Sequence, residues 1–237
     1  MNLSQFDTDV LYQQFITSAP YNHVVIDNFA DPEYLKELLC EIKEFNDAIT
    51  EEKKHQDRDS IVQNKKAGFS DIQRMPPRAK QFFEFANSSA MIEFIEKVTG
   101  IDKLLPDESF FGGGIHRTLQ GGHLSIHADF NIHPYTQKHR RVNMLLYLNE
   151  HWKSGDNGEL ELWEKDMSCC AKKIPPIFNR AVIFRITDDA FHGHPLPWEN
   201  PEPRLSLALY YYSTDRPESE KRESHMALWQ YRTKDGF

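Results

Sequence analysis

Histidine and aspartate side chains that could bind a metal ion gather between residues 123 and 133, in the stretch HLSIHADFNIH. Within it, His127 and Asp129 are two residues apart, so on a β-strand both side chains would point to the same face. An imidazole nitrogen and a carboxylate oxygen placed in this way could share one transition-metal ion. The pair is weak evidence by itself, because a second pair, His55 and Asp57, lies in a charged stretch where we expect a solvated surface.

The residues that follow make the first pair the stronger candidate. The stretch RITDDAFHGHPLP supplies two more histidines, His192 and His194, and Arg204 follows twelve residues after His192 in the run RLSLALYYY. Two histidines and one carboxylate on one face of an octahedral iron ion leave three coordination positions open. Three positions are enough for a bidentate 2-oxo acid and dioxygen.

The elements that must position these residues begin with helices. A short strand at 23–26 leads into a helix with Asp31 as N-cap and Pro32 at its first position, and two further helices are expected between 76 and 101, the last ending at Gly100. Residues 50–74 have no sustained apolar period, so we expect a long mobile loop that could cover a site.

Short β-rich runs dominate from Phe110 onward. They lie at 123–130, 142–149, 159–164, 181–186 and 204–213, separated by Gly, Asn, Asp and Pro. Helices followed by antiparallel strands predict an α+β fold with a jelly-roll core and the N-terminal helices packed outside. We expect one domain over 1–237, with a helical part at about 1–105, a β core at about 106–214 and a short C-terminal tail or helix.

Composition limits the classes of partner. The net charge of −8 provides no strong positive field for a phosphate backbone, so we expect no nucleic-acid partner. The three cysteines form no CxxC motif, and no apolar run is long enough to cross a bilayer. The N-terminus carries acids where a signal peptide needs basic residues. We therefore expect a cytoplasmic protein without membrane contact, whose oligomeric state the sequence leaves open.

Eight segments, in order along residues 20–214, resemble the Fe(II)/2-oxoglutarate-dependent dioxygenase superfamily and, within it, the prolyl-4-hydroxylase-like group. They are VIDNFADPEYLKEL, FIEKVTGI, HADF, RRVNMLLYLNEHW, GELELWE, IPPIFNRAVIF, FHGHP and RLSLALYYY. The resemblance implies a double-stranded β-helix, an oxygenase that acts as a hydroxylase, and Fe(II), 2-oxoglutarate and O2 as cofactors.

The resemblance also assigns roles to individual residues. It makes His127, Asp129 and His192 the catalytic iron ligands, and Arg204 the partner of the distal carboxylate of 2-oxoglutarate. Ser206 lies on the same strand face as Arg204 and can donate to the same carboxylate. Tyr147 matches a tyrosine that some relatives use there, and Asn143 lies on its face four residues earlier; Tyr147 could equally be a core aromatic residue.

Several histidines and pocket residues stay open. His192 and His194 could each be the third ligand, and the family motif, which places the ligand first, favours His192. His116, His123 and His133 match no motif position and are expected on strand surfaces or a pocket rim. Further rim candidates are Trp163, His123 and Arg140 or Arg141.

The resemblance implies hydroxylation of an unactivated C–H bond with release of succinate and CO2. The substrate would be small or peptidyl: a peptidyl proline or amino acid, or alternatively a sugar or other small metabolite. The intact Asp129 argues against halogenation, and Tyr210 stands where nucleic-acid demethylases of the superfamily place a second arginine. From another class, the alternative is a non-catalytic jelly-roll binding module.

Overall fold

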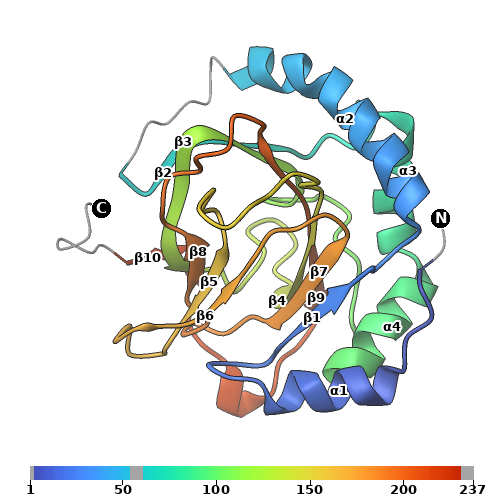
Figure 1. Ribbon diagram of the computed structural model, residues 1–237. Coiled ribbons are helices and arrows are strands. Elements are labelled where there is room, and N and C mark those ends of the chain that lie inside the picture. The colour runs from blue at the N-terminus through green and yellow to red at the C-terminus, as the bar shows by residue number, and fades with distance from the viewer. Residues whose placement is uncertain (1–2, 54–60, 231–237) are drawn as a thin grey trace.

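The computed structural model describes residues 3–53 and 61–230, and its centre is a curled antiparallel sheet. The strands are β1 (His23–Asp27), β2 (Gln63–Phe69), β3 (Gly114–Ala128), β4 (His139–Tyr147), β5 (Leu160–Trp163), β6 (Cys170–Ile174), β7 (Arg180–Arg185), β8 (His192–His194), β9 (Arg204–Ser213) and β10 (Leu228–Trp229). The helices α1 (Thr8–Thr17), α2 (Pro32–Lys53), α3 (Pro77–Ala86) and α4 (Ser89–Thr99) lie along one side of the sheet (Figure 1). This arrangement confirms the α+β jelly roll with helices outside.

The strands follow the order β1-β7-β4-β9-β3-β8-β5-β6, and β2 and β10 also pair with β3. β3 belongs to both layers of the roll, because its first half (114–118) pairs with β9 and its second half reaches β8 at Leu124 and His127. Gly121, whose φ of 79° suits glycine, lies between these two halves. β3 therefore connects the strand that carries Arg204 to the strand that carries His192.

Alternating side chains on β4 and β9 separate the helix-facing core from the inside of the roll. The apolar core that includes the helices contains Val142, Met144, Leu146, Leu205, Leu207, Leu209 and Tyr211. The residues between them face the opposite side, as the strand period of two requires. Both faces of β9 are covered, so all ten of its residues are buried. The inner face receives Asn143, Tyr147, Arg204 and Ser206.

The helix ends agree with the sequence signals. Ser88 caps α4 by accepting a hydrogen bond from the backbone N–H of Met91, and Gly100 ends it in the left-handed conformation with φ 67°. Leu35, Leu38 and Ile42 of α2 are fully buried. No helix in the described ranges combines the length and the hydropathy needed to cross a membrane.

One expectation about irregular segments is wrong, and for the C-terminal segment, expected as a tail or a helix, the helix is not observed. Residues 50–74 are not one long loop, because α2 continues to Lys53 and β2 pairs with β3 over Gln63–Phe69. The charged C-terminal segment forms no α-helix in its described part: it contains a 3-10 turn at Glu218–Glu220, and β10 pairs with β3. β2 and β10 form because they pair with β3, and not because of an apolar alternation in their own sequences. The pair His55 and Asp57 lies outside the described residues.

Candidate active site

Three side chains from the ends of β3 and β8 meet in a group that could hold a metal ion. In the described part of the chain, one ligand atom each from His127, Asp129 and His192 lie within 4.8 Å of one another. The Nε2 atoms of His127 and His192 lie 3.6 and 3.3 Å from the Asp129 carboxylate oxygens. His192 is the register partner of His127 across β8 and β3, which explains why His192 rather than His194 joins the group.

Backbone carbonyls fix the proton on each histidine ring. Nδ1 of His127 lies 2.9 Å from the carbonyl oxygen of Ser125, and Nδ1 of His192 lies 2.9 Å from that of Ala190. Because a carbonyl can only accept, each Nδ1 carries a proton, and Nε2 is the ring nitrogen that faces Asp129 and would face a metal ion. Burial lowers the pKa of His127, which favours the neutral ring that a metal ligand requires.

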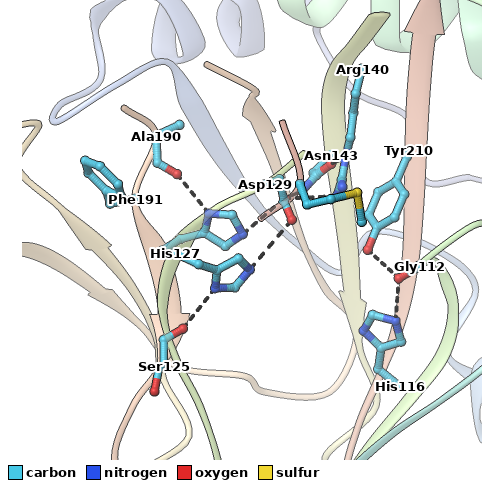
Figure 2. A network of polar contacts seen from close by, with 12 residues as sticks. Gly112, His116, Ser125, His127, Asp129, Arg140, Asn143, Ala190, Phe191 and Tyr210 are labelled. Atoms are coloured by element: carbon cyan, nitrogen blue, oxygen red, sulfur yellow. Dashed lines mark hydrogen bonds and ion pairs between the residues drawn. The ribbon is translucent and has the colours of Figure 1, made fainter. Parts of the chain in front are cut away.

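The Asp129 carboxylate is held by two further side chains of β4 (Figure 2). Its Oδ2 accepts hydrogen bonds from Asn143 Nδ2 at 2.7 Å and from Arg140 Nη2 at 2.9 Å. The Arg140 guanidinium carbon also lies 3.4 Å from the centroid of the Tyr210 ring. Burial alone would raise the pKa of Asp129, but Arg140 and the two histidines hold it well below its usual value.

A pocket of about 200 Å³ extends from this group along the inside of the roll. Arg204, Ser206 and His194 line it together with the three candidate ligands. Arg204 is 4% exposed; its Nε donates to the carbonyl of Gly158 at 2.8 Å, and its guanidinium lies 5.0 Å from the centroid of the Tyr147 ring. The Tyr147 hydroxyl is buried without a hydrogen-bond partner among the described residues. The pocket therefore has donors at the end where Arg204 lies and candidate metal ligands at the other.

The remaining predicted residues divide into pocket and scaffold. Arg140 and His116 line the pocket. Arg141 points away from it, toward Ser213 and Glu220. His133 bonds Ser109 through Nε2 and accepts two backbone N–H groups through Nδ1, so it organises a loop. Trp163 and His123 do not line the pocket. The indole of Trp163 donates to Glu161, and His123 contacts the carbonyl of Ile61.

Among the pocket residues that the sequence analysis missed, Lys66 and Trp229 carry the most chemistry. Lys66 of β2 lines the pocket, and its segment carried no strand signal. Trp229 of β10 also lines it, with its ring centroid 4.7 Å from that of His127. A lone tryptophan in a charged tail was the one available signal, and it did not indicate which strand the tail would meet.

Comparison with known proteins identifies an oxygenase domain within the chain. Residues 113–212, which contain all three candidate ligands and Arg204, match the model of the 2OG-Fe(II) oxygenase superfamily. The chain carries a 2OG-Fe(II) oxygenase domain. It is thus a 2-oxoglutarate-dependent oxygenase, and the cofactors of the superfamily are Fe(II), 2-oxoglutarate and O2. Two imidazoles and a carboxylate are a donor set that fits Fe(II), and the buried Arg204 fits a carboxylate.

Solved structures share the fold at low identity. A prolyl-4-hydroxylase from Pseudomonas putida is 15% identical, with a TM-score of 0.58 over 87% of this chain and 99% of that one. A prolyl hydroxylase from Trichoplax adhaerens, solved with a hypoxia inducible factor peptide fragment, is 17% identical, with a TM-score of 0.62 over 87% and 89%. A collagen prolyl hydroxylase of Paramecium Bursaria Chlorella virus-1, solved with 2OG, is 17% identical, with a TM-score of 0.52 over 81% and 96%. The oxygenase domain thus has the fold of the prolyl-4-hydroxylase-like group.

Proposed function

We propose that this oxygenase hydroxylates an unactivated C–H bond of a peptidyl proline or an amino acid, with release of succinate and CO2. The observation that carries the proposal is the joining of a His–Asp–His group and a buried arginine in one pocket. The proposal takes residues 1–237 as one oxygenase domain. A sugar or other small metabolite is the alternative substrate for the same chemistry.

In this proposal the iron ligands are His127, Asp129 and His192. Bound iron supplies the activation of O2 that is coupled to decarboxylation of 2-oxoglutarate. The two Nδ1–H···O=C bonds hold the imidazoles in the tautomer that leaves Nε2 free for the metal. Arg140 and Asn143 fix the Asp129 carboxylate, so one of its oxygens stays available in a defined direction.

At the opposite end, Arg204, Ser206 and Tyr147 would hold the distal carboxylate of 2-oxoglutarate. The Tyr147 hydroxyl, buried without a partner in the described chain, gains an acceptor when a carboxylate binds. The reaction balances as one C–H bond, one O2 and one 2-oxoglutarate giving one C–OH, one succinate and one CO2. One oxygen atom enters the substrate, and the other enters succinate.

Support for a peptidyl substrate comes from the Trichoplax relative, which was solved with a bound peptide. The pocket also offers aromatic surface, because Phe130 and Tyr210 line it beside Arg140. These rings and the Arg140 stem could pack against an apolar ring or side chain while the metal end receives the reacting carbon.

An anaerobic titration of the apoprotein with Fe(II) and then 2-oxoglutarate tests the proposal. We expect a weak visible metal-to-ligand charge-transfer band in the wild type, loss of the band in His192→Ala, and its retention in His194→Ala. Succinate release with candidate peptides and amino acids then identifies the substrate. A folded wild-type protein that gives no band would refute the proposed function and favour a non-catalytic binding module.

A further inference from the structure

The pocket end opposite the metal group carries positive charge that the chain does not neutralise. The Lys and Arg side chains that line the pocket are Lys66, Arg140 and Arg204, and Arg140 is paired with Asp129. Lys66 forms no ion pair or side-chain hydrogen bond among the described residues, and Arg204 donates to a carbonyl rather than to a carboxylate. Asp129 lines the same cavity but is bonded to Arg140, so Lys66 and Arg204 have no direct ion pair, which is costly unless a ligand supplies an anion.

The strand register brings these two cations to the same place. Lys66 on β2 lies opposite Thr118 on β3, and Thr118 lies opposite Arg204 on β9. Residues directly opposite one another on neighbouring antiparallel strands present their side chains on one face. Lys66 and Arg204 therefore belong to a single row across three strands, and both line the pocket.

A third group reaches the pocket from the opposing layer. His194 of β8 is 3% exposed, and neither of its ring nitrogens has a hydrogen-bond partner in the described part of the chain. It lines the same cavity as Lys66 and Arg204. A buried ring without partners costs stability, and this cost is removed when a ligand supplies an acceptor.

We propose that Lys66 is a second cationic partner of the distal carboxylate of the co-substrate, which it binds together with Arg204 and a ring N–H of His194. This inference rests on the proposed function. A carboxylate has two oxygens and about four lone-pair directions, so it can accept from an arginine, a lysine and an imidazole at once. The cluster thereby selects a dicarboxylate over a 2-oxo acid with an apolar tail.

Calorimetric titration tests this assignment without turnover. Protein loaded with Mn(II) is titrated at pH 7 with 2-oxoglutarate and, separately, with 2-oxopentanoate, which has the same chain length but no distal carboxylate. In Lys66→Met we expect 2-oxoglutarate to bind about tenfold to a hundredfold more weakly, as for loss of a hydrogen bond to a charged group. Binding of 2-oxopentanoate should not change, because it offers Lys66 no anion.

A neighbouring lysine provides the matched control. The Lys65 side chain is exposed and donates to the carbonyl of Gln120, so Lys65→Met should leave both affinities unchanged. In the double variant Lys66→Met/Arg204→Met, the fold-loss of 2-oxoglutarate affinity should be smaller than the product of the two single fold-losses, because both cations would bind one carboxylate. Circular dichroism and urea unfolding confirm that each variant is folded.

Other outcomes separate this inference from the function on which it rests. If Lys66→Met weakened the binding of 2-oxoglutarate and 2-oxopentanoate equally, Lys66 would act through a general electrostatic effect, and the assignment would be overturned. Unchanged 2-oxoglutarate binding with a raised KM for the hydroxylated substrate would place Lys66 against that substrate instead. A wild-type protein that does not bind 2-oxoglutarate would refute the proposed function itself.

Discussion

The two ends of the pocket differ in how far the chain satisfies its own polar groups. At the metal end, Asp129 is bonded by Arg140 and Asn143, and both histidine rings donate to carbonyls. At the opposite end, Lys66 has no acid partner, and the Tyr147 hydroxyl and His194 ring have no hydrogen-bond partner, in the described residues. The chain itself supplies hydrogen-bond partners to the polar groups of the metal end, whereas the polar groups of the opposite end gain partners when a ligand binds.

The difference follows from what each end must do. Metal ligands must keep a fixed direction, and their supporting hydrogen bonds provide it at no cost on binding. A site for a dissociable carboxylate gains affinity from groups that improve their bonding only when the ligand enters. Substitutions at the metal end should therefore damage both the apoprotein and binding, whereas those at the opposite end should damage mainly binding.

The largest effect is expected for Asp129→Ala. It removes one of three proposed ligands, so turnover and Fe(II) binding should be abolished. It also leaves Arg140, which is 1% exposed, without its acid, at about 3–5 kcal/mol of unfolding free energy. Urea unfolding of the apoprotein measures the second loss, and anaerobic Fe(II) titration measures the first.

A double variant separates these two losses. In Asp129→Leu/Arg140→Met both members of the buried pair become apolar, so the unfolding free energy should largely recover. Fe(II) binding should remain absent. If Asp129→Ala bound Fe(II) as tightly as the wild type, the His–Asp–His group would not be the metal site.

Arg204→Ala should show the opposite pattern. Loss of the charge that meets the distal carboxylate should weaken 2-oxoglutarate binding by about 3–5 kcal/mol. Fe(II) affinity should be nearly unchanged, and apoprotein stability should fall less than in Asp129→Ala, because Arg204 leaves behind the Gly158 carbonyl rather than a buried charge. Arg180→Ala, which removes an ion pair with Asp27 outside the pocket, is the control and should leave co-substrate affinity unaltered. Unchanged affinity in Arg204→Ala would contradict its assignment.

The metal end could be predicted from sequence better than the opposite end. His127, Asp129 and His192 belong to short motifs that match the family in order, so the resemblance pointed to them, although the local pattern was weak and left His194 as an alternative to His192. The spacing between Asn143 and Tyr147 also predicted which face of the strand Asn143 lies on. The spacing did not predict that the curl of β4 places Asn143 beside Asp129. Lys66 could not be found, because β2 owes its existence to pairing with β3, a contact remote in sequence.

A pH dependence distinguishes the two ends further. Burial first, and then the Arg204 charge, lower the pKa of Lys66 to about 8, while Asp129 opposes this shift. The ammonium is present below that pH, so 2-oxoglutarate affinity should be highest there and fall as pH rises toward 9.5.

Asp129, His194 and Arg204, which line the same pocket as Lys66, do not titrate in this range. The pKa of Asp129 is well below its usual value, burial and neighbouring cations lower the pKa of His194, and Arg204 stays charged. Calorimetry with Mn(II)-loaded protein measures the profile. In Lys66→Arg the affinity for 2-oxoglutarate should not depend on pH over this range. An affinity that still falls with pH in this variant would assign the titration to another group.

The smallest effect is expected for Trp229→Ala, which tests whether the C-terminal strand supports the metal end. The Trp229 ring packs on His127 at 4.7 Å between centroids, and β10 pairs with β3 at the same residue. Loss of this ring contact should weaken Fe(II) binding by about 0.5–1.5 kcal/mol, and Trp229→Phe should restore most of it. Met226→Ala, at a side chain that is 60% exposed on the same segment, is the matched control. Because the Nδ1 bond to Ser125 already orients His127, complete loss of metal binding in Trp229→Ala would show that β10 builds the site rather than covers it.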